Sequence, residues 1–387
     1  MNTISISRRK FAQLLGVGAA AAVARPALSL AGPPPDASPA ASSNGAAETI
    51  VRLSSNENPY GPSPKALKAM TDAFGLSCRY PDDTAELLVD ALAKLNGVSR
   101  DQILLGDGSG EILKVCAETF TGPATNGKNG VGGRGKLVVA DPTFEAILAH
   151  AKIYGADTVK VPLTLTFSHD LPKMAAAAKE GLIYICNPNN PTASITPKGE
   201  LSAFIAKAPR QTMILVDEAY HHYADSSDYE SVIPLIKDNP NLIVARTFSK
   251  IYGMAGLRCG YCIAQHEVIE RMRPHQSWDS VNLMALAAAT ASLNDPDQVA
   301  NGRRLNSEAK AFVIGELDKM GFEQIPSQAN FIMFNVKRPV VPLIQGLKQR
   351  HVNVGRLFPA LPNHMRLTIG KKAEMEAFLA AFREVVA

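Results

Sequence analysis

The sequence predicts an α/β fold with a mostly parallel central sheet that carries helices on both faces, and a smaller α+β domain. From residue 100 onward, short apolar runs alternate with segments of helical spacing, which is typical of parallel strands joined by helices. Each run is followed by polar, Gly or Pro residues, which end a strand. The predicted strands cover residues 103–105, 137–140, 182–186, 213–216, 242–245 and 261–264.

The pattern changes after about residue 282, where long Ala- and Leu-rich helical stretches begin. Short strands are expected near residues 322–325, 331–334 and 365–369, and a terminal helix from Lys371. We therefore expect an N-terminal arm that belongs partly to the small domain, a large domain and a small C-terminal domain. These cover residues 49–80, 81–285 and 286–387, respectively.

The composition is that of an ordinary water-soluble protein of 387 residues, with 46% hydrophobic and 20% charged residues. It excludes disordered, collagen-like and disulfide-stapled classes, since five cysteines make no framework in a chain of this size. The net charge of +4 equals the charge of four basic residues in the first 31, so the body gives no support to nucleic-acid or anionic-membrane binding. Those four residues are Arg8, Arg9, Lys10 and Arg25.

The N-terminal segment has the features of an export signal. The pair Arg8-Arg9 precedes a mild apolar stretch at residues 11–23, and small residues at 29–31 suit a cleavage site. This arrangement resembles a twin-arginine signal peptide over residues 1–31, which predicts an exported, periplasmic protein, with tethering by an uncleaved leader as a variant. A frayed amphipathic N-terminus is the alternative. Residues 32–48 are expected to form a flexible linker, and no stable membrane span is expected.

Polar residues at the strand ends are where chemistry is expected, because ligands of open α/β sheets bind outside the carboxyl ends of the strands. Residues 106–111, Gly-Asp-Gly-Ser-Gly-Glu, lie between a strand and a helix expected to start near Ile112. The free N–H groups at such a helix start bind anions. A plain tight turn remains open, because the spacing is not that of a dinucleotide site.

Two later strand ends carry charged side chains. Asp217 follows a fully apolar run, and a buried carboxylate must pair with a cation or take up a proton. Lys250 and Arg258 follow the next strand together with hydroxyl side chains and Gly-rich turns. Nearby cations would lower the pKa of Lys250, as an imine-forming amine requires, although a solvated surface lysine is the common alternative.

The motifs at these positions resemble those of class I/II pyridoxal-phosphate aminotransferases, with most likeness to the histidinol-phosphate aminotransferase branch. They occur in family order over nearly everything after residue 50. The motifs are LSSNENPYGPSP (53–64), RYPD (79–82), GDGSGEIL (106–113), DPTF (141–144), NPNNPT (187–192), VDEAY (216–220), RTFSK (246–250), GLRCGY (256–261) and SQANF (327–331). The resemblance implies fold type I.

The resemblance also implies roles around pyridoxal 5'-phosphate. Lys250 would form the Schiff base with the cofactor aldehyde, and Asp217 would keep the pyridine nitrogen protonated. Asn190 and Tyr220 would hydrogen-bond the 3' oxygen of the ring, and Phe144 would stack on the ring face. The catalytic residues implied are therefore Lys250, Asp217 and Tyr220.

The cofactor phosphate would be bound by backbone N–H groups, hydroxyls and one guanidinium. Tyr60, in the ENPYG segment, would reach the phosphate of the other subunit, which implies a homodimer with shared active sites; a surface aromatic in a Pro-rich turn is the alternative for Tyr60. The same-chain phosphate ligands implied are Ser109, Gly110, Glu111, Thr247, Ser249 and Arg258.

Two arginines are implied for the substrate. Arg366 resembles the arginine that clamps an acidic group in two contacts, and Arg356 stands where the histidinol-phosphate branch has a second arginine for a phosphate. Surface arginines are the alternative for both. The chain also departs from the branch: Gly110 stands in place of an Asp, Ala193 in place of a Gly, and residues 274–282 replace a shorter segment.

Three further signals favour structural roles over sites. Cys259 and Cys262 have C-x-x-C spacing, but residues three apart on a strand point to opposite faces. We interpret His221-His222 as a polar loop after a strand, and no metal site is expected. Trp278, the only tryptophan, is expected in the core, with a pocket wall as the alternative.

The sequence thus predicts a transaminase that moves an amino group between an amino acid or related amine and a 2-oxo acid by a ping-pong mechanism. Its partners would be a small-molecule amino donor and a keto-acid acceptor. A decarboxylase, lyase or cyclase on the same scaffold is the nearest alternative. An exported binding or structural protein with a dead site is a third, against which the joint presence of Asn190, Asp217, Tyr220, Lys250 and Arg258 argues.

Overall fold

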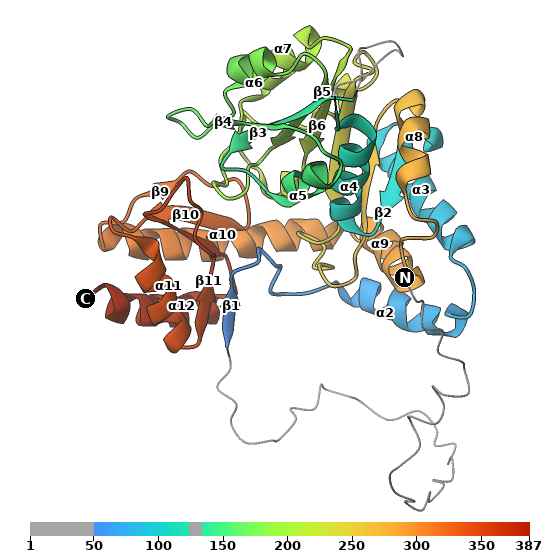
Figure 1. The fold of residues 1–387 in the computed structure, drawn as a ribbon. Helices are drawn as coiled ribbons and strands as arrows, with labels where there is room; N and C mark the ends of the chain where they lie inside the picture. Colours follow the sequence, from blue (N-terminus) through green and yellow to red (C-terminus); the bar gives the residue numbers. More distant parts are fainter. Residues whose placement is uncertain (1–49, 124–133) are drawn as a thin grey trace, which may run out of the picture. The chain divides into compact units, whose positions relative to one another are not determined.

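A seven-stranded sheet forms the centre of the larger part of the molecule (Figure 1). The computed structural model describes residues 50–123 and 134–387, so the predicted leader and linker lie outside the described residues. Strand β8 runs antiparallel to both of its neighbours, and the other neighbouring strands are parallel. In spatial order the strands are β2 (Ile103–Gly106), β8 (Gly260–Ile263), β7 (Leu242–Thr247), β6 (Thr212–Asp217), β5 (Gly181–Cys186), β3 (Lys136–Asp141) and β4 (Thr158–Pro162).

All six strands predicted for this sheet are present, and the mostly parallel arrangement is confirmed. The sequence reading missed β4, which lies at the edge of the sheet. Its exposed Thr158 and Lys160 interrupt the apolar run, and it ends in Pro162, as edge strands tolerate.

Helices cover both faces of the sheet, and the side chains of each strand alternate between two hydrophobic cores. One core contains Ile183 of β5 and the other contains its neighbours Leu182 and Tyr184. The first face carries α3 (Asp82–Asn96), α6 (Leu171–Ala177), α7 (Lys198–Lys207) and α9 (Leu283–Leu293). The second carries α4 (Gly108–Phe120), α5 (Ala146–Ile153) and α8 (His266–Met272).

The two cysteines of the C-x-x-C spacing lie in different cores. Cys259 packs on the face covered by α3 and α9, and Cys262 packs on the face covered by α4. Their thiols therefore cannot meet on one ion, as the strand geometry predicts.

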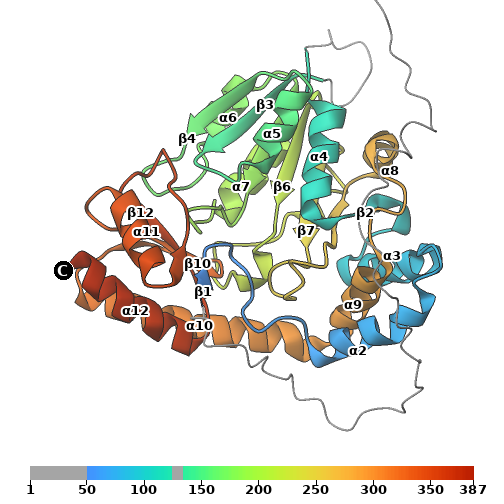
Figure 2. The same ribbon diagram turned by 60° about the horizontal axis from the view of Figure 1, so that its bottom comes forward.

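A smaller α+β part is built from two short sheets and three helices (Figure 2). Phe322 and Phe334 pack against Phe378 and Phe382 in its core. Its strands are β9 (Gln324–Ile325), β10 (Phe331–Asn335), β12 (His364–Thr368), and the parallel pair β1 (Val51–Leu53) and β11 (Val352–Val354). Its helices are α10 (Pro296–Lys319), α11 (Val340–Gln349) and α12 (Lys372–Val386).

The three predicted strands and the terminal helix of this part are confirmed, whereas the pairing of β1 with β11 was not predicted. This pairing joins segments about 300 residues apart, Val51 with Val352, and no local pattern indicates it. The predicted domain boundary after residue 285 lies inside α9, and the division into domains stays a prediction.

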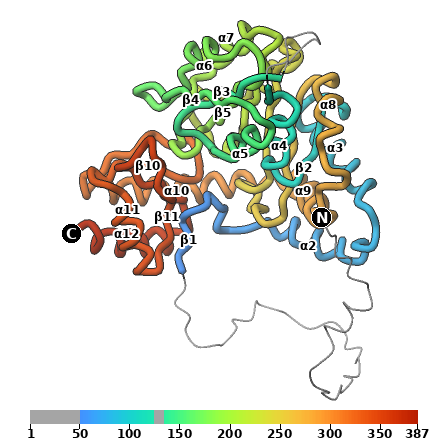
Figure 3. The backbone as a smooth tube through the Cα atoms, in the orientation of Figure 1, coloured from blue at the N-terminus to red at the C-terminus, as the bar shows by residue number. Residues whose placement is uncertain are grey.

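The chain leaves β1 and runs across to α2 (Pro64–Ala73), as the tube in Figure 3 shows. Residues 54–56 of this crossing line the cavity described below. This crossing brings residues 54–56 to the carboxyl ends of the large sheet. Short 3-10 helices complete the fold at Phe74–Leu76, Arg100–Gln102, His221–Tyr223, Ile233–Leu235 and Arg273–His275.

Helix α4 begins at Gly108, earlier than the start near Ile112 that the sequence predicted. Gly108 has a φ of +72°, and a Cβ there would overlap the guanidinium of Arg258. The Gly-rich turn is therefore the first turn of the helix itself. Ser109, Gly110 and Glu111 place their backbone N–H groups at its positive end.

In the part of the chain that the structure describes, we find no helix with the length and apolar character needed to cross a bilayer. Trp278 is 96% exposed, so its expected place in the core is wrong. It lies beside Tyr80, also exposed, in a surface hollow away from the central cavity. None of residues 274–282 lines the central cavity of this chain.

Candidate active site

A cavity of about 750 Å³ lies at the carboxyl ends of the parallel strands and extends to the small part. It is lined by five basic side chains and two carboxylates, which favours an anionic ligand. Twelve predicted site residues line it: Ser109, Gly110, Phe144, Asn190, Asp217, Tyr220, Thr247, Ser249, Lys250, Arg258, Arg356 and Arg366. Glu111 and Tyr60 are not among its lining residues.

Asp217, the last residue of β6, is a buried carboxylate with two hydrogen bonds. The Tyr184 hydroxyl donates to its Oδ2 at 2.8 Å, and the Ala219 N–H donates to its Oδ1 at 3.1 Å. Burial raises the pKa of Asp217 to about 6, although these two hydrogen bonds oppose the rise. A carboxylate held in this way favours a cationic partner in the cavity.

Tyr184 is a site residue that the sequence reading missed. It lies in β5 beside β6, and its ring packs in the core while its hydroxyl reaches Asp217. A tyrosine within an otherwise aliphatic buried strand was the available signal, because a buried hydroxyl needs a partner.

Lys250, just after β7, directs its amine into the cavity. Its Nζ donates to the backbone oxygen of Asn56 at 3.2 Å and lies 5.5 Å from the centre of the Tyr220 ring. Burial lowers the pKa of Lys250 to about 8, helped by the positive charge of Arg366 and opposed by Asp217. An amine with this pKa accepts and releases a proton near neutral pH, as a general base must.

Asn56 is a second residue whose role was missed, although it stands within a quoted motif. Its side-chain amide donates to the Tyr220 hydroxyl at 3.0 Å, and the Asn190 amide donates to the same oxygen at 3.4 Å. Its backbone oxygen accepts from both Lys250 and Asn330. The crossing segment therefore fixes the hydroxyl of Tyr220 and the amine of Lys250 together.

Hydroxyl groups, a guanidinium and the start of α4 gather at one end of the cavity. The Thr247 hydroxyl donates to the Ser249 hydroxyl at 3.0 Å, and Arg258 Nη1 lies 3.4 Å from the same Ser249 oxygen. Arg258 also donates to the backbone oxygen of Asp107, at the start of α4. A Cβ on Gly260 would overlap the Ser109 nitrogen, so glycine lets β8 lie against the helix start. This cluster of donors suits a phosphate.

Glu111 contributes to this end through its position in α4. Its carboxylate accepts from the Asp107 N–H at 2.7 Å and from the Ser277 N–H at 3.3 Å, and so points away from the cavity. Its backbone N–H group belongs to the first turn of the helix. Phosphate binding by that group stays a prediction.

Phe144 lies in the loop between β3 and α5 and is 39% exposed. The loop is tied to the NPNNPT segment, because the Thr143 hydroxyl donates to Asn189 at 3.0 Å and Asn189 donates to the Pro142 oxygen at 3.1 Å. Thr143 and Asn189 were not predicted. This network holds Phe144 as one wall of the cavity.

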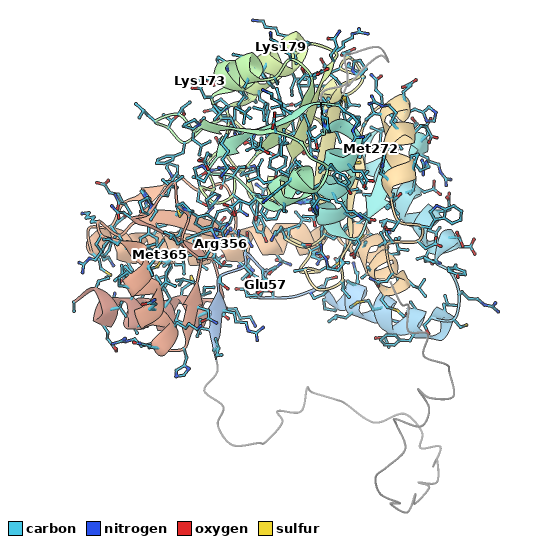
Figure 4. The ribbon with its side chains drawn as sticks, in the orientation of Figure 1. Glu57, Lys173, Lys179, Met272, Arg356 and Met365 are labelled. Atoms are coloured by element: carbon cyan, nitrogen blue, oxygen red, sulfur yellow. The ribbon has the colours of Figure 1, made fainter. Side chains whose placement is uncertain are left out.

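Arg366 and Arg356 lie toward the small part, and Figure 4 marks Arg356 on its side facing the large sheet. Arg366 donates to the Asn190 side chain at 2.7 Å and to the Ser54 oxygen at 2.5 Å. Its buried Nε has no hydrogen-bond partner in the described structure. Arg356 is paired with Glu145, which the sequence reading missed. The structure therefore brings both arginines to one cavity.

Tyr60 stands apart from this set. It is 43% exposed, and the ammonium of Lys371 lies 5.7 Å from its ring centre. It does not line the cavity of its own chain. Its predicted contact with the phosphate of a partner subunit stays a prediction.

His221 and His222 lie in the connection after β6, as predicted, and are half-buried there. They form a 3-10 helix with ring centres 3.7 Å apart, and burial lowers the pKa of His222 to about 3. His222 contacts the Tyr252 hydroxyl. Among the described residues, no group of three or more His, Cys, Asp or Glu side chains could hold a metal ion.

Comparisons with known proteins identify the family. Residues 48–382 match the model of the aminotransferase class I and II family, and the chain belongs to this family. The histidinol-phosphate aminotransferase of Moorella thermoacetica is 37% identical over 343 residues, covering 87% of this chain and 86% of that protein. The histidinol-phosphate aminotransferase of Symbiobacterium thermophilum is 37% identical over 337 residues, covering 86% of this chain and 90% of that protein.

One similar solved structure contains a bound cofactor. The histidinol-phosphate aminotransferase from Sinorhizobium meliloti, in complex with pyridoxal-5'-phosphate, is 27% identical and superposes with a TM-score of 0.79. The match covers 87% of this chain and 91% of that one. The predicted fold type I and the predicted enzyme class, an aminotransferase that uses pyridoxal phosphate, are confirmed.

The residues present fit this cofactor. A buried carboxylate of raised pKa, Asp217, suits a protonated ring nitrogen, and the donors around Arg258 and the start of α4 suit a phosphate. Lys250 supplies an amine of lowered pKa in the same cavity. Each chemical group of the cofactor thus has a matching group on the chain.

Proposed function

We propose that this protein transfers an amino group between an amine that bears an acidic group and a 2-oxo acid, in two half-reactions. The observation that carries the proposal is that Lys250, with a pKa lowered to about 8, lines the same cavity as Asp217 and two arginines. That combination supplies a proton carrier, a site for a ring cation and sites for acidic groups.

Pyridoxal phosphate, when bound, supplies an aldehyde for amine exchange and a ring that accepts electrons. Asp217 would hold a proton on the ring nitrogen, and the donors of Ser109, Thr247, Ser249 and Arg258 would bind the phosphate. Tyr220 and Asn190 would orient the ring oxygen, since their hydroxyl and amide already meet at 3.4 Å.

The amine of Lys250 would move the proton at the substrate Cα. Near pH 8 about half of its population is neutral and able to accept a proton at Nζ, and the protonated form can return it to another carbon. Asn56 directs this amine through its backbone oxygen.

The substrate proposed is histidinol phosphate or a close analogue. Curated relatives that carry the name histidinol-phosphate aminotransferase are 34–37% identical over 86–88% of this chain, which supports this choice. Arg366 and Arg356 provide two guanidinium groups, which suit the single phosphate of this substrate and the two carboxylates of an amino donor such as glutamate. The absent Asp at position 110 and the divergent segment 274–282 make the substrate the point that most needs a test.

A homodimer belongs to the proposal. Exposed Tyr60 lies outside its own cavity, which is compatible with a contact to a partner subunit. Cross-linking a Tyr60→Cys variant to the partner would test this contact, and a monomeric active enzyme would contradict it. We also propose export by a twin-arginine route, from Arg8-Arg9, the apolar stretch at residues 11–23 and the small residues at 29–31. Cytoplasmic retention of an Arg8→Lys/Arg9→Lys variant, with wild type in the periplasm, is the expected result.

The decisive test is a half-reaction screen. Purified protein loaded with pyridoxal phosphate is mixed with amino donors, including histidinol phosphate and glutamate, and the visible absorption of the cofactor is followed. We expect conversion to the amine form with release of a keto compound that mass spectrometry detects. Release of carbon dioxide with return of the original spectrum would instead assign a decarboxylase.

A further inference from the structure

An ion pair crosses the outer end of the cavity between Glu145 and Arg356. Glu145 directly follows Phe144 and immediately precedes α5 of the large part, whereas Arg356 follows β11 of the small part. Both side chains line the cavity, and they are 45% and 55% exposed, respectively. The pair therefore lies where a substrate enters, with water on one side.

Arg356 is held in place for this contact. Its guanidinium lies 4.5 Å from the ring centre of Phe358 and donates to the Leu357 oxygen at 2.9 Å. Arg366 lies over the same ring at 5.2 Å. The pKa of Arg366 is lowered by burial and also by the positive charge of Arg356, so the two cations repel each other.

Glu145 is the counter-charge at this end of the cavity. The other carboxylate in the lining, Asp217, is buried at the end of β6 and hydrogen-bonded to Tyr184. Lys348 of α11 also lines the cavity. Without Glu145, Arg356 and Lys348 would have no acid beside them at this end of the cavity.

We infer that Glu145 is a specificity-determining residue that occupies Arg356 until the distal anion of a substrate displaces it. This inference rests on the proposed function, because it needs an anionic substrate. A carboxylate and a phosphate must both displace Glu145. The displaced carboxylate stays on the short loop beside Phe144, so it then repels the bound anion.

That repulsion grows with the charge of the anion. A phosphate monoester carries about −1.5 to −2 charges at pH 7, and a carboxylate carries one. Glu145 therefore disfavours a phosphate more than a carboxylate. The half-exposed position keeps the effect modest, since exposed ion pairs change an equilibrium by only about two- to fivefold.

The test measures anion binding to the cofactor-loaded protein by calorimetry at low salt, with inorganic phosphate and with glutarate. The variants are Glu145→Gln, Arg356→Gln and the double variant. Glu384→Gln is the matched control, because Glu384 pairs with Arg350 at 2.7 Å on the surface, outside the cavity. We expect Glu145→Gln to tighten phosphate binding about two- to fivefold.

Two comparisons make the result specific. Glutarate binding should tighten less than phosphate binding, and in the Arg356→Gln background the Glu145→Gln change should have little effect. Phosphate affinity that is absent, unchanged or weaker in Glu145→Gln overturns the inference, as does equal tightening without Arg356. Equal tightening in Glu384→Gln would assign the effect to net charge and would also overturn it.

The same protein separates this inference from the proposed function. If no amino donor converts the bound cofactor while Glu145→Gln still tightens phosphate binding, the proposed reaction fails and the inference stands. If the cofactor-loaded enzyme transaminates but Glu145→Gln does not change its anion affinity, the inference fails and the proposed function stands.

Discussion

The inner and outer ends of the cavity use charge in different ways. At the inner end, Asp217 is buried and Lys250 is half-buried, and removal from water moves the pKa values of both toward neutrality, to about 6 and about 8. At the outer end, Glu145 and Arg356 form a half-exposed ion pair. Buried charges are fixed and costly, whereas exposed charges are screened and exchangeable. The inner end therefore suits chemistry, and the outer end suits the choice of substrate.

Lys250→Ala should give the largest effect at the inner end. Without its amine the chain loses the group that moves the Cα proton, so kcat should fall about 10³-fold or more while the cofactor still binds. Stopped-flow absorption with an amino donor measures this. Lys173→Ala, which removes an exposed lysine of α6 outside the cavity, is the control. Retained transamination in Lys250→Ala would contradict the assignment.

Asp217→Asn should have the second-largest effect on activity. A neutral amide cannot stabilise a ring cation, and kcat should fall about 10²- to 10³-fold. Folding should tolerate the change, because it removes a buried charge. Thermal unfolding of the cofactor-free variant tests whether the fold tolerates the change. Steady-state kinetics measure the fall in kcat. Wild-type kcat in a folded Asp217→Asn variant would show that the ring nitrogen needs no carboxylate.

Arg366 and Arg356 lie at different depths in the cavity, so their substitutions can be compared directly. Arg366 is largely buried and makes short hydrogen bonds to Asn190 and Ser54, whereas Arg356 is half-exposed. A charge-assisted hydrogen bond lost in a buried site lowers affinity about 10- to 100-fold, and a screened one lowers it only a few fold. Arg366→Gln should therefore raise KM more than Arg356→Gln. The reverse order would place the main acidic group of the substrate at the outer end.

The sequence predicted the inner end better than the outer end. Asp217, Lys250 and Arg258 stand at strand ends within dense motifs, and local pattern was enough to find them. Glu145 was missed because its partner Arg356 is 211 residues away, on another part of the fold. Asn56 was missed as a contact for the same reason, since Tyr220 and Lys250 are 164 and 194 residues away.

Some structural predictions depended on facts that local sequence does not carry. The six strands of the large sheet were found from apolar runs, but the edge strand β4 and the β1–β11 pair were not. The exposure of Trp278 contradicts what its residue type suggests. Tertiary packing decides whether such a side chain is buried, and its residue type gives only an average tendency.

Tyr184→Phe should give the smallest effect, a shift in a pH profile. The Tyr184 hydroxyl lowers the pKa of Asp217, so its loss should raise that pKa from about 6 by roughly half to one unit. Binding of the cofactor favours ionised Asp217, so affinity falls as pH drops through this pKa. In the variant the fall should begin at higher pH. Fluorescence titration of cofactor-free protein from about pH 5 to 8 measures the shift, with Tyr223→Phe as a buried-tyrosine control. An unmoved profile would mean that the ionisation of Asp217 does not govern cofactor binding, and the division between a buried chemical end and an exchangeable outer end would lose its electrostatic basis.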